Sequence, residues 1–356
     1  MSAALLRGAA GAGLGACLCA IVLSACAQAP TRTRLNGKTM GTTWSVTLSG
    51  KSAGEGERLR AGIERELDRV VAQMSTFERD SDLSRYNRAA AGTWQDLPEE
   101  FANVLGAALA QARDSGGAFD PTVGPLVELW GFGPGKTVHE VPSVQAIETA
   151  RARIGWQRVE FDPQRRRVLQ PGGVHLDLSA IAKGYGVDQV ARYLLSEGRA
   201  DFLVEVGGEL RAHGERAPGE HWQVAIENPH ASDEAVSSEQ PYWRRLALVD
   251  QAVATSGDYR HTFEHAGRMY SHHIDPRSGW PVEHRIAQVT TIADGCMQAD
   301  SMGTTIMVLG PEAGLAYAQR HDMAVLLLVH EGDHLVERMS PAFAALLARQ
   351  GAVPPR

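Results

Sequence analysis

A junction between a strand and a long helix is expected in the segment Asp177-Leu178-Ser179-Ala180-Ile181-Ala182-Lys183-Gly184-Tyr185-Gly186. Helical spacing of apolar residues predicts a helix over residues 180–197 that stops at Gly198. Asp177 stands where a strand gives way to this helix, a place where free backbone amides suit anions. Lys183 is then a candidate partner for a phosphate or a carboxylate. The plain alternative is that Asp177 or Ser179 caps the helix and Lys183 lies on its solvated face.

Helices and strands alternate irregularly on both sides of this stretch. Upstream, the patterns predict a strand over 40–48, helices over 57–75, 98–115 and 144–154, and a hairpin over 159–169. Downstream, they predict two strands over 202–212, a polar loop over 230–241, a helix over 297–308, and strands over 222–227, 246–253, 288–293 and 324–329. This order, with hairpins and no fixed repeat, favours an α+β fold with mixed or antiparallel sheets flanked by helices.

The composition is that of an ordinary folded protein, with 356 residues, 44% hydrophobic and 22% charged. A formal charge of −7 argues against nucleic acid as a partner, because proteins that bind the phosphate backbone carry a basic surplus. Length alone allows two domains. The chemistry-bearing segments are spread along the whole chain and have to converge, so we expect one catalytic unit over residues 37–350.

The first 25 residues have the features of a secretory signal peptide. A basic start at Arg7 precedes an uncharged run that ends Leu23-Ser24-Ala25-Cys26. These last four residues look like a bacterial lipobox, in which Cys26 becomes the lipidated N-terminus of a tether over residues 26–36. A membrane-anchoring helix is the alternative, and the run is short and glycine-rich for one. Cleavage would leave Cys296 as the one thiol, and loss of Arg7 would take the charge from −7 to −8.

A glycine-rich loop precedes residues 177–186 in the chain. Its sequence is Gly116-Gly117-Ala118-Phe119-Asp120-Pro121-Thr122-Val123-Gly124-Pro125. Two glycines, an aromatic, an acid and a proline can form a rigid loop that brings backbone amides close to a ligand. A helix end followed by a turn explains the composition equally well.

A histidine-rich segment follows Thr255-Ser256-Gly257, and it reads Ser271-His272-His273-Ile274-Asp275-Pro276-Arg277-Ser278-Gly279. Histidine close to aspartate suits general-base catalysis near neutral pH. Two adjacent histidines on a strand would point to opposite faces, so we do not expect both to bind one metal ion. A structural turn at Asp275-Pro276 is the alternative.

Asp300 and Thr304 lie one turn apart on the helix expected over residues 297–308, so they face the same side. A carboxylate and a hydroxyl are the hard-oxygen donors that Mg²⁺ accepts alongside substrate phosphates. Zinc would call for imidazole or thiolate ligands, which this pair lacks. A polar stripe on an amphipathic helix remains the alternative.

Taken together, these segments resemble the ApbE family of flavin transferases. The resemblance spans nearly the whole mature chain in the right order, from Met40-Gly41-Thr42 and Met74-Ser75-Thr76-Phe77 through the segments above and Val206-Gly207-Gly208-Glu209 to Asp300 and Thr304. It implies that FAD is held by Met40, Phe77, Ala118, Phe119, Asp120, Asp177, Lys183 and Ile274. It also implies Mg²⁺ ligands at Asp300, Thr304 and the carbonyl of Ala180. Phe77 stands where the family often has tyrosine. Phenylalanine keeps the aromatic surface for stacking but lacks the hydroxyl group of tyrosine.

The resemblance further implies Mg²⁺-dependent transfer of FMN from FAD to a threonine or serine hydroxyl of an acceptor protein, with release of AMP. His272 would be the base, because it lies three residues before the aspartate of the His-x-x-Asp-Pro segment. Asp275 would orient His272 or hold the adjacent loop. An FAD pyrophosphatase that releases FMN and AMP, and a non-catalytic flavin-binding lipoprotein, are the alternatives.

The acceptor implied by the resemblance is a subunit of a respiratory membrane complex or a periplasmic flavoprotein. The expected location is the cell envelope, with a lipid anchor and the body facing the periplasm. The resemblance favours the inner membrane and leaves the outer membrane possible. No copy of an acceptor motif is evident in the chain, so self-modification is not expected.

Overall fold

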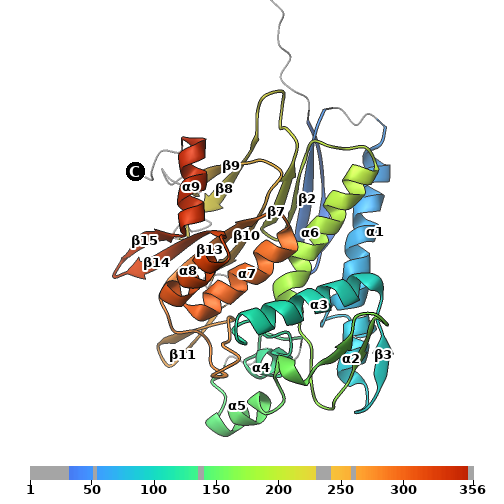
Figure 1. The fold of residues 1–356 in the computed structure, drawn as a ribbon, viewed down its shortest axis with the longest axis vertical. Helices are drawn as coiled ribbons and strands as arrows, with labels where there is room; N and C mark the ends of the chain where they lie inside the picture. The colour runs from blue at the N-terminus through green and yellow to red at the C-terminus, as the bar shows by residue number, and fades with distance from the viewer. Residues whose placement is uncertain (1–31, 51–53, 135–139, 230–241, 258–261, 352–356) are drawn as a thin grey trace, which may run out of the picture.

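An eight-stranded sheet organises the computed structural model, which describes residues 32–50, 54–134, 140–229, 242–257 and 262–351. The strand order is β1-β2-β6-β7-β10-β13-β14-β15, and each neighbouring pair is antiparallel (Figure 1). The strands are β1 Arg32–Thr39, β2 Thr42–Ser49, β6 Phe202–Val206, β7 Glu209–His213, β10 Ala252–Gly257, β13 Ile286–Ala293, β14 Ala324–Glu331 and β15 His334–Met339.

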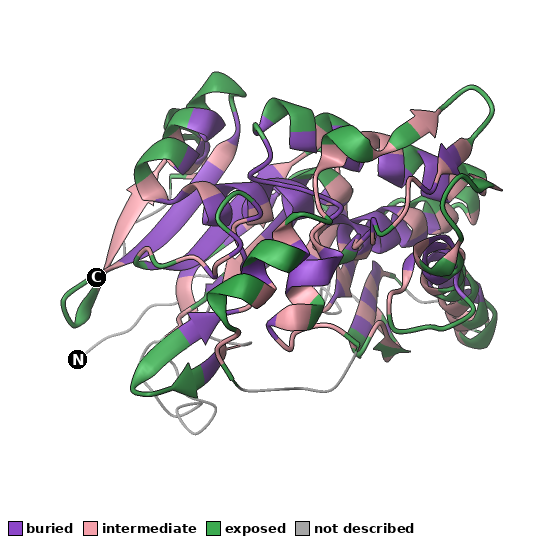
Figure 2. Cartoon of the chain, turned by 90° about the horizontal axis from the view of Figure 1, so that it is seen from below, coloured by how far each residue is buried: buried purple, intermediate pink, exposed green. Residues whose placement is uncertain are grey.

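Helices cover one face of this sheet. They are α1 Gly56–Met74, α6 Ser179–Ser196, α7 Cys296–Leu309 and α8 Pro311–Arg320. The other face is covered by the hairpin of β8 Trp222–Glu227 and β9 Tyr242–Leu248, together with α9 Pro341–Gln350. Alternate residues of strand β14 pack against the two layers that cover the sheet. Val325 and Leu327 pack with α7 and α8. Leu326 and Leu328 pack with β8, β9 and α9. Buried residues accordingly run through the middle of the molecule (Figure 2).

The remaining elements extend one end of the helical layer. They are α2 Asp82–Arg88, α3 Glu99–Asp114, α4 Gly124–Leu129, α5 Val144–Arg151, the 3-10 helix Trp156–Arg158, the small sheet of β3 Trp94–Asp96, β4 Glu160–Asp162 and β5 Arg167–Leu169, and the hairpin of β11 Thr262–His265 and β12 Arg268–Ser271. Their apolar side chains form a cluster around α3 and the start of α6, and a second cluster of α4, α5 and the β11–β12 hairpin.

The α+β prediction is confirmed, and most of the expected helices agree with the structure to within a few residues. Helices α1, α3, α6 and α7 stand where periodicity placed them, and the strands around Gly207-Gly208 pair as β6 and β7. The expected hairpin over residues 159–169 is β4 and β5. The expected loop over 230–241 and the signal peptide with Cys26 lie outside the described residues.

The strand expected over residues 40–48 is wrong at its start. Met40 and Gly41 form the turn of the β1–β2 hairpin, with φ angles of 48° and 72°. Strand β1 begins at Arg32, so the part of the expected tether from residue 32 onward belongs to the sheet. The sequence did not predict β1, because this edge strand is mostly polar and its apolar and polar residues alternate only weakly.

The single strand expected over residues 246–253 is two strands. Strand β9 ends at Leu248 and β10 begins at Ala252, and Asp250 between them has a φ of 49°. The two strands lie in different sheets, with β10 in the eight-stranded sheet and β9 in the hairpin that covers it. No helix in the described ranges has both the length and the apolar character needed to cross a membrane.

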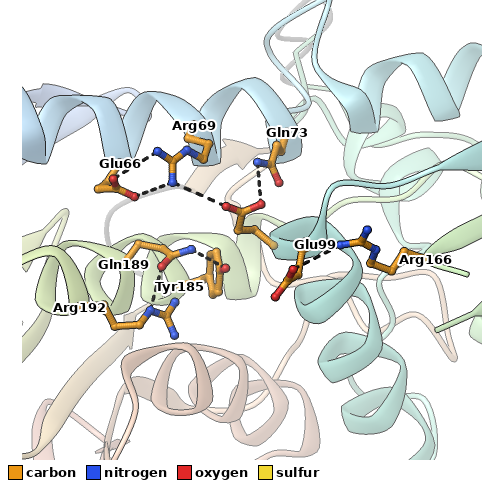
Figure 3. A network of polar contacts seen from close by, with 9 residues as sticks. Glu66, Arg69, Gln73, Glu99, Arg166, Tyr185, Gln189 and Arg192 are labelled. Carbon is orange, nitrogen blue, oxygen red and sulfur yellow. Dashed lines mark hydrogen bonds and ion pairs between the residues drawn. The ribbon is translucent and has the colours of Figure 1, made fainter. Parts of the chain in front are cut away.

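A polar network joins α1 to α3, and separate side-chain hydrogen bonds link Tyr185, Gln189 and Arg192 along α6 (Figure 3). Arg69 of α1 bonds Glu66 at 3.0 Å and reaches Glu100 of α3 at 3.7 Å. The buried Gln73 donates to the same Glu100 at 3.3 Å. Because half of the Arg69 side chain is exposed, its ion pairs orient the helices more than they stabilise them.

Helices α6 and α7 cross at Gly184, which gives a test of the packing. A Cβ placed on Gly184 would lie 2.3 Å from the carbonyl oxygen of Cys296 and 2.8 Å from Cβ of Asp300. We expect Gly184→Ala to lower the free energy of unfolding by roughly 1–3 kcal/mol, because backbone would have to move to admit the methyl group. Thermal or urea unfolding measures the change.

Gly56→Ala at the start of α1 is the matched control for this prediction. A Cβ at Gly56 would meet only Leu35, at an ordinary 3.8 Å, so equal or slightly higher stability is expected from the helix propensity of alanine. Wild-type stability for Gly184→Ala would contradict the account of the crossing.

Candidate functional site

The start of α6 is joined to the glycine-rich loop by backbone contacts. The amide of Asp177 donates to the carbonyl of Pro121 at 2.7 Å, and Oδ1 of Asp177 accepts from the amide of Ser179 at 2.8 Å. The side chain of Asp177 therefore supports the first turn of α6 from the residue before the N-cap, which is Leu178 and makes no side-chain capping bond. Asp177 is also half-buried and lines a cavity. The two motifs that lie apart in sequence form one surface.

Asp120 holds the glycine-rich loop in shape. Its Oδ1 accepts from the amide and the hydroxyl of Thr122 at 2.8 and 2.7 Å, and its Oδ2 accepts from the amide of Trp156 at 3.1 Å. Burial raises the pKa of Asp120, and the bonds from Thr122 and Trp156 counteract this. Ala118 and Phe119 are buried beside it, with Phe119 packed in the cluster around α3. In this structure the Asp120 side chain is committed to the loop.

Three oxygen groups gather where α6 crosses α7. Asp300 is buried, and its Oδ2 accepts from the amide of Gly184 at 2.9 Å. In a helix that same amide faces the carbonyl four residues earlier, which is Ala180, so this carbonyl and the Asp300 carboxylate are neighbours. Thr304 lies one turn further along α7 on the side of Asp300 and is half-buried.

This donor set fits magnesium better than a transition metal. Its members are a carboxylate, a carbonyl and a hydroxyl, which are the hard oxygen ligands that Mg²⁺ takes together with phosphate oxygens. Within the described ranges, no three His, Cys, Asp or Glu side chains come together as a metal-binding group. A cation here would depend on oxygens from the substrate to complete its coordination.

Lys183 lies between two buried carboxylates. Its Nζ donates to Oε1 of Glu209 at 2.5 Å, and Asp300 acts on it electrostatically. Burial opposes the charge of Lys183, but Asp300 and Glu209 outweigh burial and raise the pKa of its ammonium group. Burial raises the pKa of Glu209 to about 7, against the pull of Lys183. Burial also raises the pKa of Asp300.

Glu209 and Asp188 were not among the expected site residues. In the sequence, Glu209 follows Gly207-Gly208 as the first residue of a strand that also carries Arg211 and His213, so no local pattern marks it as a buried acid. Asp188 lies on α6 and accepts from the amides of Cys296 and Met297, both at 3.0 Å, which fixes the first turn of α7. It also pairs with Arg211 of β7. Nothing local in the sequence marks Asp188, because Cys296 and Met297, whose amides it binds, lie more than 100 residues away.

The two histidines lie just after β12, and their arrangement differs from the expectation. Their ring centroids are 4.0 Å apart, so they lie side by side and do not point to opposite faces. The alternation rule fails because β12 ends at Ser271, before either histidine. His273 is buried with Nδ1 3.3 Å from Oγ of Ser271, whereas His272 is half-buried and stacks edge-on against Phe132.

Asp275 holds the turn that follows. Its Oδ1 accepts from the backbone amide and Nε of Arg277 at 2.9 and 2.8 Å, and its Oδ2 accepts from Nη2 at 2.9 Å. Its carbonyl accepts from the amide of Gly279 at 2.8 Å. Of the two roles expected for Asp275, these contacts support holding the loop. Ile274 is buried in the cluster of α4 and α5, where Val123 of the glycine-rich loop also packs.

A cavity of about 420 Å³ lies beside Asp177 and Thr76, a size typical of small-molecule sites. Phe77, next to Thr76, has 66% of its surface exposed, so its ring is available for stacking. Met40 packs against α6, since a Cβ on Gly186 would lie 3.1 Å from its Cε. The structure thus brings Met40, Asp177, Ala180, Lys183, Asp300 and Thr304 to the α6–α7 region and ties Asp120 and Ile274 to the adjoining loop.

Fold and site together define an α+β enzyme whose polar groups surround the start of a helix. The chain belongs to the ApbE family, whose model matches residues 40–327. It is 36% identical to a FAD:protein FMN transferase of Haemophilus influenzae, covering 94% of this chain and 97% of the relative. Among solved structures it is similar to a flavin transferase ApbE from Vibrio cholerae, with a TM-score of 0.80 and 35% identity over 89% of this chain and 99% of that one. A flavinyl transferase ApbE from Pseudomonas stutzeri gives a TM-score of 0.80 and 38% identity over 89% and 97%.

Proposed function

We propose that this protein transfers FMN from FAD to a threonine or serine hydroxyl of an acceptor protein, with Mg²⁺ as cofactor. The observation that carries the proposal is the buried Asp300 carboxylate beside the carbonyl of Ala180 and close to Lys183, in a chain whose relatives are named FAD:protein FMN transferases. In the reaction the acceptor oxygen attacks the phosphorus of the FMN half. The bond from that phosphorus to the oxygen of the AMP half breaks, and AMP leaves.

Asp300, Thr304 and the Ala180 carbonyl would hold the Mg²⁺ ion. When bound, Mg²⁺ neutralises charge on the phosphate oxygens, which is the main requirement of phosphoryl transfer. The chain supplies further positive potential, because Lys183 belongs to the second turn of α6, close in sequence to the N-terminal amides that form the positive end of the helix dipole. An acidic protein with a formal charge of −7 needs such local cations to bind a dianionic pyrophosphate.

The acceptor hydroxyl must lose its proton, and His272 is the proposed base. Histidine titrates near neutrality and needs little tuning for this role. The half-buried His272 ring is the more accessible of the adjacent pair, whereas His273 is buried. Asp275 would act indirectly, by holding the turn that follows the two histidines.

The products formed from FAD test this function. With FAD, Mg²⁺ and a candidate acceptor, we expect AMP together with an acceptor that carries covalent flavin, and chelation of Mg²⁺ by EDTA should stop both. The measurements are chromatography of the nucleotides and in-gel fluorescence of the flavin. AMP with free FMN would instead indicate a pyrophosphatase, and bound FAD without AMP would indicate a flavin-binding protein.

Substitution of His272 by asparagine tests the base. We expect His272→Asn to lower the transfer rate at pH 7 by roughly 10²–10⁴-fold, the usual contribution of a general base, while FAD binding is retained. His265→Asn, at an exposed position on β11, is the matched control and should transfer at the wild-type rate. Unchanged transfer by His272→Asn would remove the assignment.

We also propose that residues 1–25 are a lipoprotein signal and that Cys26 anchors the mature protein to the envelope membrane, with its body in the periplasm. The Leu23-Ser24-Ala25-Cys26 sequence supports this, and strand β1 begins only six residues after Cys26. Cys26→Ser should abolish labelling with palmitate and move the protein out of the membrane fraction. A wild-type protein that takes up no palmitate would contradict the anchor, and a sucrose gradient would separate inner from outer membrane.

A further inference from the structure

The glycine turn before Glu209 fixes the place of this side chain. Val206 and Glu209 pair across Gly207-Gly208, whose φ angles are 61° and 104°. A Cβ on Gly207 would lie 2.8 Å from Cγ2 of Thr42, and the amide of Gly208 donates to Glu205 at 2.9 Å. The first residue of β7 therefore has little freedom. The proposed reaction assigns no role to this turn or to Glu209.

Glu209 is buried with one oxygen engaged and one without a partner. Only 3% of its side chain is exposed, compared with 34% for Lys183. Its Oε1 accepts from Nζ of Lys183, and its buried Oε2 has no hydrogen-bond partner in the described part of the chain. A buried carboxylate with an unused oxygen is costly, so its retention calls for a function.

The charges around Lys183 suggest what that function is. Two carboxylates attract the ammonium group of Lys183, those of Glu209 and Asp300. Within the described residues, its ion pair is with Glu209. If Glu209 were uncharged, the ammonium group would be drawn to Asp300 alone. A Lys183–Asp300 pair would then compete for the carboxylate that the proposed function assigns to Mg²⁺, and it would withdraw the ammonium group from the pyrophosphate.

We infer that Glu209 is a positioning residue for Lys183. By pairing with the ammonium group, Glu209 keeps it away from Asp300, so that Lys183 can bind the pyrophosphate and Asp300 can bind the metal ion. This inference rests on the proposed function. Glu209 itself need not touch FAD, because its effect passes through Lys183. A Lys–Glu pair that links α6 to β7 thus separates two tasks at one site.

A double-mutant cycle on FAD binding tests the inference. FAD affinity is measured by flavin fluorescence over a series of Mg²⁺ concentrations, for the wild-type protein, Glu209→Gln, Lys183→Met and the double variant. We expect Glu209→Gln to weaken FAD binding roughly tenfold, the scale of one charge-assisted hydrogen bond, and to raise the Mg²⁺ concentration needed for half-maximal binding. In the Lys183→Met background the same change should have no further effect.

Controls keep the outcome interpretable. Glu209→Asp retains the charge and should recover part of the affinity, while Glu312→Gln removes an exposed acid of α8 paired with Arg338 and should bind FAD as the wild type does. Thermal unfolding of each variant identifies loss of structure, and if Glu209→Gln does not fold, Glu209→Asp in both lysine backgrounds completes the cycle. Losses that add in free energy, or wild-type binding by Glu209→Gln, would overturn the inference.

This experiment also separates the inference from the proposed function. A wild-type protein that binds FAD with Mg²⁺ but modifies no acceptor would contradict the transferase proposal and leave the cycle valid. A wild-type protein that binds no FAD would overturn both.

Discussion

The contact between the amide of Gly184 and the carboxylate of Asp300 is the constraint on which the site depends. It requires α6 and α7 to approach so closely that the carbonyl of Cys296 and Cβ of Asp300 occupy the space a side chain at Gly184 would need. Asp188, one turn further along α6, secures the same crossing by binding the first amides of α7. Because α6 also carries Ala180 and Lys183, this one crossing determines where every proposed phosphate and metal group lies.

The crossing also brings two buried carboxylates and an ammonium group together. Asp300, Glu209 and the ammonium group of Lys183 are two acids and one base, and burial raises the pKa of both acids, Glu209 to about 7. Such a group of charges is unfavourable as a purely structural feature. Additional positive charge would offset this, and the Mg²⁺ ion of the proposed function would supply it.

Much of the fold could be predicted from the sequence because long helices have a strong period. Helices α1, α3, α6 and α7 were predicted in place, and each buries an apolar face. Short and edge elements were harder: β1 carries polar residues along the sheet edge, and β9 and β10 are separated only by a tight turn at Asp250. The prediction that His272 and His273 point to opposite faces was wrong for a related reason, because strand β12 ends before them.

Local periodicity and the order of the motifs are enough to predict the class of fold, the family resemblance and the kinds of chemical groups available. The tertiary structure alone decided which groups meet. It paired Lys183 with Glu209, bonded the side chain of Asp120 to the amide of Trp156, and placed Asp188 at the start of α7. Such contacts join residues far apart in the chain, and their strength depends on burial, which no single segment of sequence specifies.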